Sequence, residues 1–141
     1  MAGLPTQLRL QIVSADKSLV NEMVDEVEIP GADGYFGVLP GHTPLLALLG
    51  TGEMWYRRGS ETHHLVLAFG FAEVQPEAVT ILAQIAERAD EIDIARAEAA
   101  KRRAEERLAK PTMDMDFERA RLSLLKSLIR LQVASRARIR S

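Results

Sequence analysis

Six of the nine glycines lie in one short window, residues 29–52, where they could form a phosphate-binding loop. Three of them recur at a spacing of three: Gly31, Gly34 and Gly37. A phosphate loop presents backbone N–H groups at the start of a helix and continues into Gly-Lys-Ser/Thr, and neither feature follows here. Gly50-Thr51-Gly52 begins like a dinucleotide-binding motif, but Trp55 stands at the third glycine position. We therefore interpret the window as a series of backbone turns between strands.

The three histidines do not suggest a metal site. His63 and His64 are adjacent, so on a strand they point to opposite faces. His42, between Gly41 and Thr43, is predicted to be a turn residue that bonds the backbone, with contact to a partner protein as the alternative. No Ser–His–acid set and no carboxylate pair stands at a recognisable spacing. The residues therefore predict a non-enzymatic protein with no required cofactor and no metal.

Basic side chains recur at helical spacing in two segments of the last third of the chain. The first row is Arg96, Arg103 and Arg107, and the second is Arg119, Lys126 and Arg130. If the two segments pair, the rows could converge on a polyphosphate or on an acidic protein loop, because guanidinium groups bind both through paired hydrogen bonds. The alternative is that both rows are solvated helix faces.

Length and composition limit the class of protein. At 141 residues one domain is expected, or a small domain with an appendage. The chain has no cysteine, which excludes disulfides and thiolate metal sites. No apolar run approaches the ~20 residues that span a bilayer, and we expect no secretory signal at the N-terminus.

Charge is divided unevenly along the chain. Residues 1–116 carry 11 basic and 19 acidic side chains, whereas residues 117–141 carry seven basic side chains and one acidic one. Such a division points to an acidic partner for the basic end, whether protein, nucleic acid or membrane surface, or to its association with the acidic body.

The first part of the chain has the pattern of short strands. Residues 7–12 alternate polar and apolar side chains, and residues 24–29 are again strand-like, with Val27 and Ile29 on one face and acids on the other. Two hairpins are predicted, one around Arg58-Gly59-Ser60 and one around Gln75-Pro76-Glu77. Regular Gly/Pro punctuation indicates a sandwich or barrel. We expect this β domain at residues 1–86.

Residues 87–141 contain no glycine and one proline, Pro111. Helix-forming residues dominate, and the proline divides them into two helices whose short connection favours an antiparallel hairpin. The first helix is expected from Asp93, as N-cap, to about Ala109, and the second from Asp114 or Asp116 to Ala137. The first has a thin, alanine-rich apolar stripe that buries little area.

The second helix carries two apolar stripes, where a surface helix usually has one. One stripe is Phe117, Ala120, Leu124, Leu128 and Leu131, and the other is Leu122, Leu125, Ile129 and Val133. Either one stripe packs on the first helix and the other on the β domain, or the second stripe binds another chain. In both cases the hairpin is expected to adhere weakly through the first helix.

The glycine window carries a family resemblance. Ile29-Pro30-Gly31, the run from Gly34 to Leu46, Phe71–Val74, Val79–Ala83 and Ile92-Asp93…Arg96-Ala97 resemble the epsilon subunit of bacterial and plastid F-type ATP synthases. The resemblance extends over nearly the whole chain in the same order. It implies an α+β fold: an N-terminal antiparallel β-sandwich followed by a C-terminal antiparallel two-helix hairpin, residues 87–141.

The resemblance also implies a role and partners. The protein would be a non-catalytic rotor subunit of the central stalk, bound to the gamma subunit and the c-ring. It would lie on the cytoplasmic face of the bacterial inner membrane, or the stromal thylakoid face in a plastid, and meet the membrane only through the complex. The extended hairpin would reach the alpha and beta subunits and block ATP hydrolysis, with inhibitory contacts at Arg119, Leu122, Leu125, Lys126, Ile129, Arg130 and Val133.

Some members of this family bind regulatory ATP through an Ile/Leu-Asp-x-x-Arg-Ala motif, which residues 92–97 match. By position, the resemblance places the ATP contacts at Glu87, Ile92, Asp93, Arg96, Ala97, Arg103, Lys126 and Arg130. Lys126 departs from the family pattern, since ATP-binding members have arginine there, and lysine keeps the charge but loses the planar fork.

The resemblance places a c-ring contact at Tyr35 and His42. Tyr35 is a second departure, because many relatives carry an acid at this position, so stacking or hydrogen bonding replaces a charge pair. The competing interpretation of the whole chain is a free-standing module that binds nucleic acid or an anionic membrane through its basic helix. The interleaved apolar residues and the acidic body argue against this interpretation, and we expect no nucleic acid among the partners.

Overall fold

The computed structural model describes residues 3–139, and side chains through residue 137. Two compact units divide the chain between Arg88 and Ala89, two residues beyond the boundary predicted at Ala86. Of the predicted basic residues at the C-terminal end, Arg140 and the side chain of Arg138 lie outside the described part. Each unit is described by itself.

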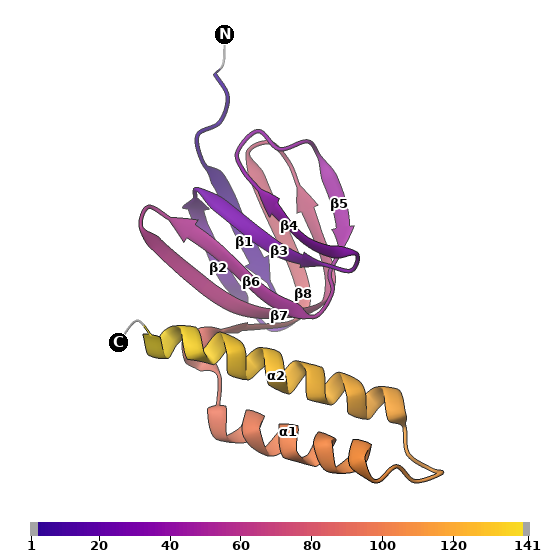
Figure 1. Cartoon of the computed structure of the whole chain (residues 1–141). Helices are drawn as coiled ribbons and strands as arrows, with labels where there is room; N and C mark the ends of the chain where they lie inside the picture. The colour runs from indigo at the N-terminus through magenta and orange to yellow at the C-terminus, as the bar shows by residue number, and fades with distance from the viewer. Residues whose placement is uncertain (1–2, 140–141) are drawn as a thin grey trace. The chain divides into compact units, whose positions relative to one another are not determined.

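The first unit is a β-sandwich of eight strands within its described residues (Figure 1). The strands are β1 Leu8–Val13, β2 Ser18–Val24, β3 Glu26–Gly31, β4 Gly34–Val38, β5 Leu45–Leu48, β6 Gly52–Arg58, β7 Glu61–Val74 and β8 Ala78–Arg88. Their order is β2-β1-β8-β7-β6-β3-β4, with β5 also on β7. The sandwich and both predicted hairpins are confirmed. One pair, β1 with β8, is parallel, and the other pairs are antiparallel.

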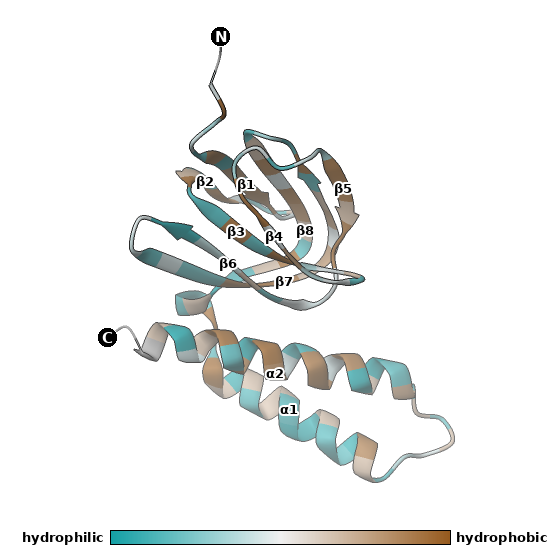
Figure 2. Ribbon diagram, turned by 45° about the horizontal axis from the view of Figure 1, so that its top comes forward, coloured by the Kyte–Doolittle hydropathy of each residue, from teal (hydrophilic) through white to brown (hydrophobic). Residues whose placement is uncertain are grey.

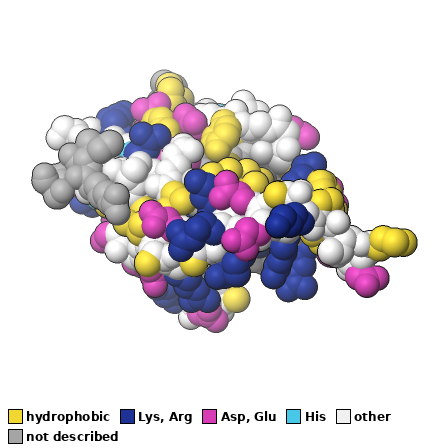
Figure 3. Space-filling model, turned by 60° about the horizontal axis from the view of Figure 1, so that its bottom comes forward, with side chains coloured by type: hydrophobic (Ala, Val, Ile, Leu, Met, Phe, Trp, Pro, Cys, Tyr) yellow, Lys and Arg dark blue, Asp and Glu magenta, His cyan; other side chains and the backbone are white. Residues whose placement is uncertain are grey.

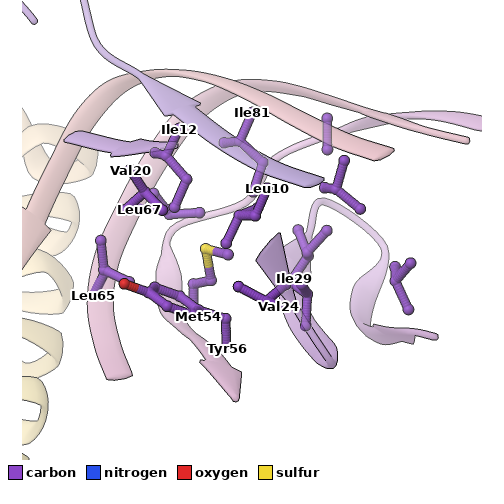
Figure 4. Packing of buried hydrophobic residues seen from close by; sticks show 14 of the residues in the cluster. Leu10, Ile12, Val20, Val24, Ile29, Met54, Tyr56, Leu65, Leu67 and Ile81 are labelled. Carbon is purple, nitrogen blue, oxygen red and sulfur yellow. The ribbon is translucent and has the colours of Figure 1, made fainter. Parts of the chain in front are cut away.

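The core lies between the two layers and is built from inward-facing aliphatic side chains. Alternation of hydrophobic and hydrophilic residues along the strands is visible in Figure 2. Figure 4 shows the centre of the cluster, where fully buried side chains of β1, β6, β7 and β8 point toward one another: Leu10, Ile12, Met54, Leu65, Leu67 and Ile81. Burial of this apolar surface is the main stabilising term of the sandwich.

A sharp kink lets β7 serve both layers. Its first half pairs with β6 and its second half with β5, and Phe69 and Gly70 between them have φ angles of 59° and 135°. The inward-facing residues change parity there, from Leu65 and Leu67 to Ala72 and Val74. A strand that passes from one layer to the other needs such a bend, and Gly70 supplies it without a Cβ.

A polar cluster closes one corner of the sandwich. The Asp25 carboxylate, between β2 and β3, accepts a 2.6 Å hydrogen bond from the Gly59 N–H in the β6–β7 turn. Gln7 donates to the same carboxylate at 3.4 Å, and the Arg57 guanidinium lies 3.5 Å away. The Gly59 N–H, followed by Gln7, lowers the pKa of Asp25 below its ordinary value. The cluster therefore ties two turns together most firmly when Asp25 is ionised.

The second unit is an α-helical hairpin. A 3-10 turn, Ala89–Glu91, leads to α1, Ile94–Ala109, and α2 follows as Phe117–Ile139. Asp93 and Asp116 are the N-caps, since their carboxylates accept hydrogen bonds from the N–H groups of Arg96 and Arg119 at 3.1 and 3.0 Å. Both predicted helix starts are therefore correct, with Asp116 chosen over Asp114.

Small side chains line the contact between the two helices. Ala97 and Ala104 of α1 and Ala120 of α2 are buried, and Ser127 is buried with its hydroxyl bonded to the Ser123 carbonyl at 2.8 Å. Such side chains allow close helix approach but bury little apolar area each. The thin stripe predicted for the first helix is present in the structure.

Candidate interaction surfaces

An apolar row crosses three strands on the outward side of the sandwich. Leu48 of β5 pairs with Phe71 of β7, which pairs with Leu82 of β8, so the three side chains are cross-strand neighbours on one face. Their exposed fractions are 70%, 43% and 41%. Exposed large apolar side chains that stand together mark interaction surfaces more often than single ones do. The sequence alone does not predict this row.

A groove of about 630 Å³ lies beside the row, between the β3–β4 turn and β5. Its lining is mostly apolar and includes Leu46, which is 69% exposed, and Tyr35, which is 58% exposed. Asp33 is the one charged residue of the lining. The Tyr35 hydroxyl accepts a 3.2 Å hydrogen bond from the Glu53 N–H, which fixes the ring at the margin of the groove.

The glycine window forms the wall of this groove. A Cβ on Gly50 would lie 2.9 Å from the Gly31 carbonyl oxygen, closer than side chains ordinarily approach. The Ala32 N–H bonds the Leu48 carbonyl and the Gly50 N–H bonds the Pro30 carbonyl, each at 2.9 Å. These contacts join the β3–β4 hairpin to the end of β5. The glycines therefore permit close packing of backbones between strands, as the sequence indicated.

His42 lies in the next loop, where the ring Nδ1 is 2.6 Å from the Thr43 carbonyl oxygen. Its N–H also bonds the Leu39 carbonyl at 3.1 Å, so His42 is part of a turn. A smaller groove of about 340 Å³ runs past His42 and Leu39, which is 56% exposed. The turn role predicted for His42 is confirmed, and its half-buried ring is partly accessible to a partner.

His63 and His64 point in different directions. His63 stacks on Tyr56 with ring centroids 5.0 Å apart and lies 3.5 Å from the Glu61 carboxylate. His64 lies 3.4 Å from the Glu53 carboxylate. Among the described residues no group of three or more metal-ligating side chains could hold an ion.

The Ile-Asp-x-x-Arg-Ala segment begins α1. Asp93 is the N-cap, and its hydrogen bond comes from the backbone of Arg96, which leaves the Arg96 guanidinium exposed. Ile92 and Ala97 are buried at the positions of a hydrophobic staple, before the cap and on the first turn. Three of the four motif residues thus have a structural task, and the Arg96 side chain is the one that could bind a ligand.

The other residues assigned to ATP lie on three elements. Arg103 is exposed on α1, Lys126 and Arg130 are half-buried on α2, and Glu87 belongs to β8 of the sandwich. None of the three grooves described here is lined by these residues. The structure places the two helices side by side, and it leaves the convergence of their basic rows on one ligand as a hypothesis.

The first half of α2 exposes apolar side chains. Phe117 is 49% exposed, and Leu125 and Leu128 are 43% exposed, whereas Ile129 and Val133 farther along are buried. A groove of about 570 Å³ follows the exposed part and is lined by Asp116, Glu118, Arg119, Arg121, Leu122, Leu124, Leu125 and Leu128. The two predicted stripes are therefore not uniform: each contains buried and exposed members.

Charges of both signs surround the exposed apolar residues. On the face shown in Figure 3, Lys/Arg and Asp/Glu side chains lie interspersed, with apolar side chains between them. A nucleic-acid surface is usually basic over a continuous stripe. No helix among residues 3–139 is both long and apolar enough to cross a membrane. Protein partners are the class that such a mixed surface favours.

A sandwich with an apolar outer row, joined to a helical hairpin, defines a two-part docking subunit. Residues 7–89 match the family model described as "ATP synthase, Delta/Epsilon chain, beta-sandwich domain". Residues 90–135 match the model of the "long alpha-helix domain" of the same chain. The chain belongs to the family of ATP synthase epsilon chains, which are non-catalytic subunits, and the resemblance found in the sequence is confirmed.

Bacterial relatives align over most of the chain. The ATP synthase epsilon chain of Nitratidesulfovibrio vulgaris is 47% identical over 130 residues, covering 92% of this chain and 97% of the relative. The epsilon chain of Syntrophobacter fumaroxidans is 46% identical with the same coverage, and that of Solibacter usitatus is 41% identical over 94% of this chain and 99% of the relative.

Solved structures share the fold. A chain of the Euglena gracilis mitochondrial ATP synthase superposes with a TM-score of 0.71 at 23% identity, covering 99% of this chain and 84% of that chain. A chain of the Tetrahymena thermophila mitochondrial ATP synthase, from a structure of its central stalk and c-ring, gives 0.55 at 12% identity, covering 96% and 98%. At these identities the likeness extends to the fold alone.

Proposed function

We propose that the chain is a central-stalk subunit of the ATP synthase, with its sandwich bound to the gamma subunit and the c-ring and its hairpin inhibiting ATP hydrolysis. The observation that carries this proposal is apolar surface left exposed on two separately folded units. Through these partners the chain would be held at the cytoplasmic face of a bacterial membrane.

The sandwich has two surfaces for its partners. The row Leu48–Phe71–Leu82 supplies apolar area for the gamma subunit. The Tyr35 and His42 loops, with the grooves that they line, supply the contact with the c-ring. Burying the row would remove three large side chains from water. Because about half of each side chain is already covered, each would contribute about 1 kcal/mol to the free energy of binding. This surface explains attachment but not inhibition.

Single-cysteine crosslinking tests the orientation of the sandwich, because the chain has no native cysteine. Tyr35→Cys should crosslink to loops of the c-ring in the assembled complex. Ser60→Cys, on the exposed β6–β7 turn, is the control and should not. Crosslinking at position 60 with none at position 35 would reject the proposed orientation.

Exposed apolar surface on α2 supports the inhibitory role proposed for the hairpin. The apolar side chains on the first half of α2, at Phe117, Leu125 and Leu128, are exposed in the hairpin as described. In an extended state they would be buried against the alpha and beta subunits, with Arg119, Lys126 and Arg130 on acidic groups there. A partner or ligand shifts the hairpin between states only by its difference in affinity for them.

Truncation from about Asp114 onward should raise ATP hydrolysis by the assembled enzyme while assembly is retained. A finer test uses Leu125→Gln against Met113→Gln. Leu125 is 43% exposed on α2 and Met113 is 103% exposed in the connection between helices, so neither change should disturb folding by more than about 0.5 kcal/mol. Leu125→Gln should raise ATP hydrolysis, whereas Met113→Gln should leave it unchanged. Equal hydrolysis in the truncated and intact complexes would reject inhibition by the hairpin.

Regulatory ATP would act by favouring one hairpin state. The exposed guanidinium groups of Arg96 and Arg103, with Lys126 and Arg130 on the second helix, are the phosphate-binding groups of this proposal. Arg96→Gln separates ligand binding from structure, since the cap on Asp93 uses the Arg96 backbone and survives the change. Calorimetry on the whole chain should show heat at millimolar ATP that Arg96→Gln abolishes. No heat from the unmodified chain would reject ATP binding.

A further inference from the structure

We propose that Arg88 is a positioning residue. It anchors residues 83–88, the C-terminal end of β8, and so fixes the point at which the helical hairpin leaves the sandwich. This inference goes beyond the proposed function and does not depend on it. It rests on the hydrogen bond of Arg88 to β2, on its interaction with Tyr56, and on the pairing of β8.

The end of β8 is held by strand pairing on one edge only. β8 pairs with β7 as far as Arg88, which is opposite Leu65. On its other edge, β8 pairs with β1 only through Leu82. Residues 83–88 therefore have a single ladder, and a strand end with one ladder opens more readily than one with two.

Arg88 supplies the missing attachment. Its Nη2 donates a 2.7 Å hydrogen bond to the carbonyl of Leu19 in β2, a residue 69 positions away in the sequence. Its guanidinium also interacts with the hydroxyl of Tyr56 in β6 and lowers the pKa of that phenol, against the larger raising effect of burial. One side chain thus connects β8 with β2 and β6, neither of which is its neighbour in the sheet.

Tyr56 makes this attachment specific. The side chain is 1% exposed, stacks on His63, and its hydroxyl contacts Glu22 of β2 as well as Arg88. A buried phenol must keep its hydrogen bonds, because losing them inside the protein costs more than the bonds contribute in water. A guanidinium can only donate and a carboxylate can only accept, so Arg88 and Glu22 complement the two roles of the phenol hydroxyl.

The consequence concerns the length of the connection to α1. Five residues, Ala89 to Asp93, separate Arg88 from the first residue of α1. If residues 83–88 detached, the connection would grow to eleven residues and could extend by up to about 20 Å. The effective concentration of a tethered element falls roughly as the −3/2 power of tether length. The longer connection would therefore lower the effective concentration of the hairpin at any surface that it contacts by about threefold. Arg88 keeps the tether short.

Amide hydrogen exchange on the whole chain tests the inference. Arg88→Gln should reduce protection of residues 83–88 by about tenfold, as expected for the loss of charged hydrogen bonds, while residues 78–82 keep theirs. Arg58→Gln is the matched control, since Arg58 lies 3.7 Å from Glu22 in the same cluster but is half exposed and does not belong to β8. It should leave residues 83–88 protected.

Tyr56→Phe removes one of the two attachments of Arg88 and should give an intermediate loss of protection confined to the same residues. Unchanged protection in Arg88→Gln would overturn the inference. An equal loss over the whole sandwich would also overturn it, because Arg88 would then stabilise the unit as a whole. Since exchange is measured on the isolated chain, the result stands whether or not the hairpin inhibits hydrolysis.

Discussion

Replacing Gly70 with alanine should destabilise the sandwich far more than any other single methyl addition in the glycine-containing loops and strands. Gly70 lies at the kink of β7, where φ is 135°, a conformation that alanine rarely adopts. An added Cβ would lie 2.9 Å from the carbonyl carbon of Leu82 and closer still to its oxygen. Both atoms are backbone of β8, so no side-chain rotation relieves the overlap.

The magnitude follows from two costs. Holding alanine in this backbone conformation costs about 1–3 kcal/mol. Moving β8 away from β7 breaks at least one buried ladder hydrogen bond near the kink, at about 1–3 kcal/mol. The sum is about 4 kcal/mol. For a unit of this size, 88 residues, that corresponds to a fall in Tm of about 20 °C.

Fluorescence of the single tryptophan, Trp55 on β6, reports unfolding of the sandwich, and far-UV circular dichroism reports the helices. Gly37→Ala is the matched control: a Cβ there meets nothing within 4 Å, and its stability should change by less than about 1 kcal/mol. If Gly70→Ala unfolded within about 1 kcal/mol of the unmodified chain, the argument from the kink would be refuted.

Three further predictions concern caps and buried or bonded ionisable groups. Asp116→Ala should destabilise α2 by about 1 kcal/mol in thermal melts, whereas Asp114→Ala, which removes no capping bond, should not. Asp25→Asn should flatten the loss of stability that sets in as pH falls below about 4, since the folded-state pKa of Asp25 is lowered by the Gly59 N–H. Burial raises the pKa of Tyr56, so stability should fall as pH rises above about 10, by up to about 1.4 kcal/mol per pH unit, and Tyr56→Phe should abolish that part of the fall. Parallel pH profiles of variant and unmodified chain would contradict either of the last two.

The hairpin was predictable because its signals are local. Pro111 breaks the helical run, and Asp93 and Asp116 stand one position before their helices. Caps depend on residues three apart in the sequence, so no knowledge of the fold is required. The β6–β7 hairpin was predictable for the same reason, since Gly59 with a φ of 62° marks its turn.

Strand β2 was not predicted, and the reason is the cluster around Tyr56. Val20 and Val24 are buried on the core side, but the residue between them on that side is Glu22. A charged residue at a core-facing position interrupts the alternation by which strands are found. Glu22 is tolerated there because its carboxylate lies 3.7 Å from the Arg58 guanidinium and interacts with the Tyr56 hydroxyl, and the sequence pattern does not reveal these distant partners.

The apolar row was not predictable either, because its members come from three strands. Leu48, Phe71 and Leu82 become neighbours only through the registers of β5, β7 and β8. One signal did exist: the run Leu45 to Leu49 has five consecutive apolar residues, more than a strand with one buried face requires. Parallel pairing of β1 with β8 likewise follows from topology and not from either strand's own sequence.

The groove beside β5 has a nearly uncharged lining, and this determines how the attachment of the sandwich to its partners should change with temperature and salt. Attachment through apolar area weakens on cooling and is little affected by salt, whereas contacts made by basic side chains of α2 weaken as ionic strength rises. Chilling and salt would therefore act on different ends of the same chain. A complex washed in concentrated salt at room temperature should keep the sandwich in place while its hairpin is released. Cold storage should weaken the attachment of the sandwich more than that of the hairpin.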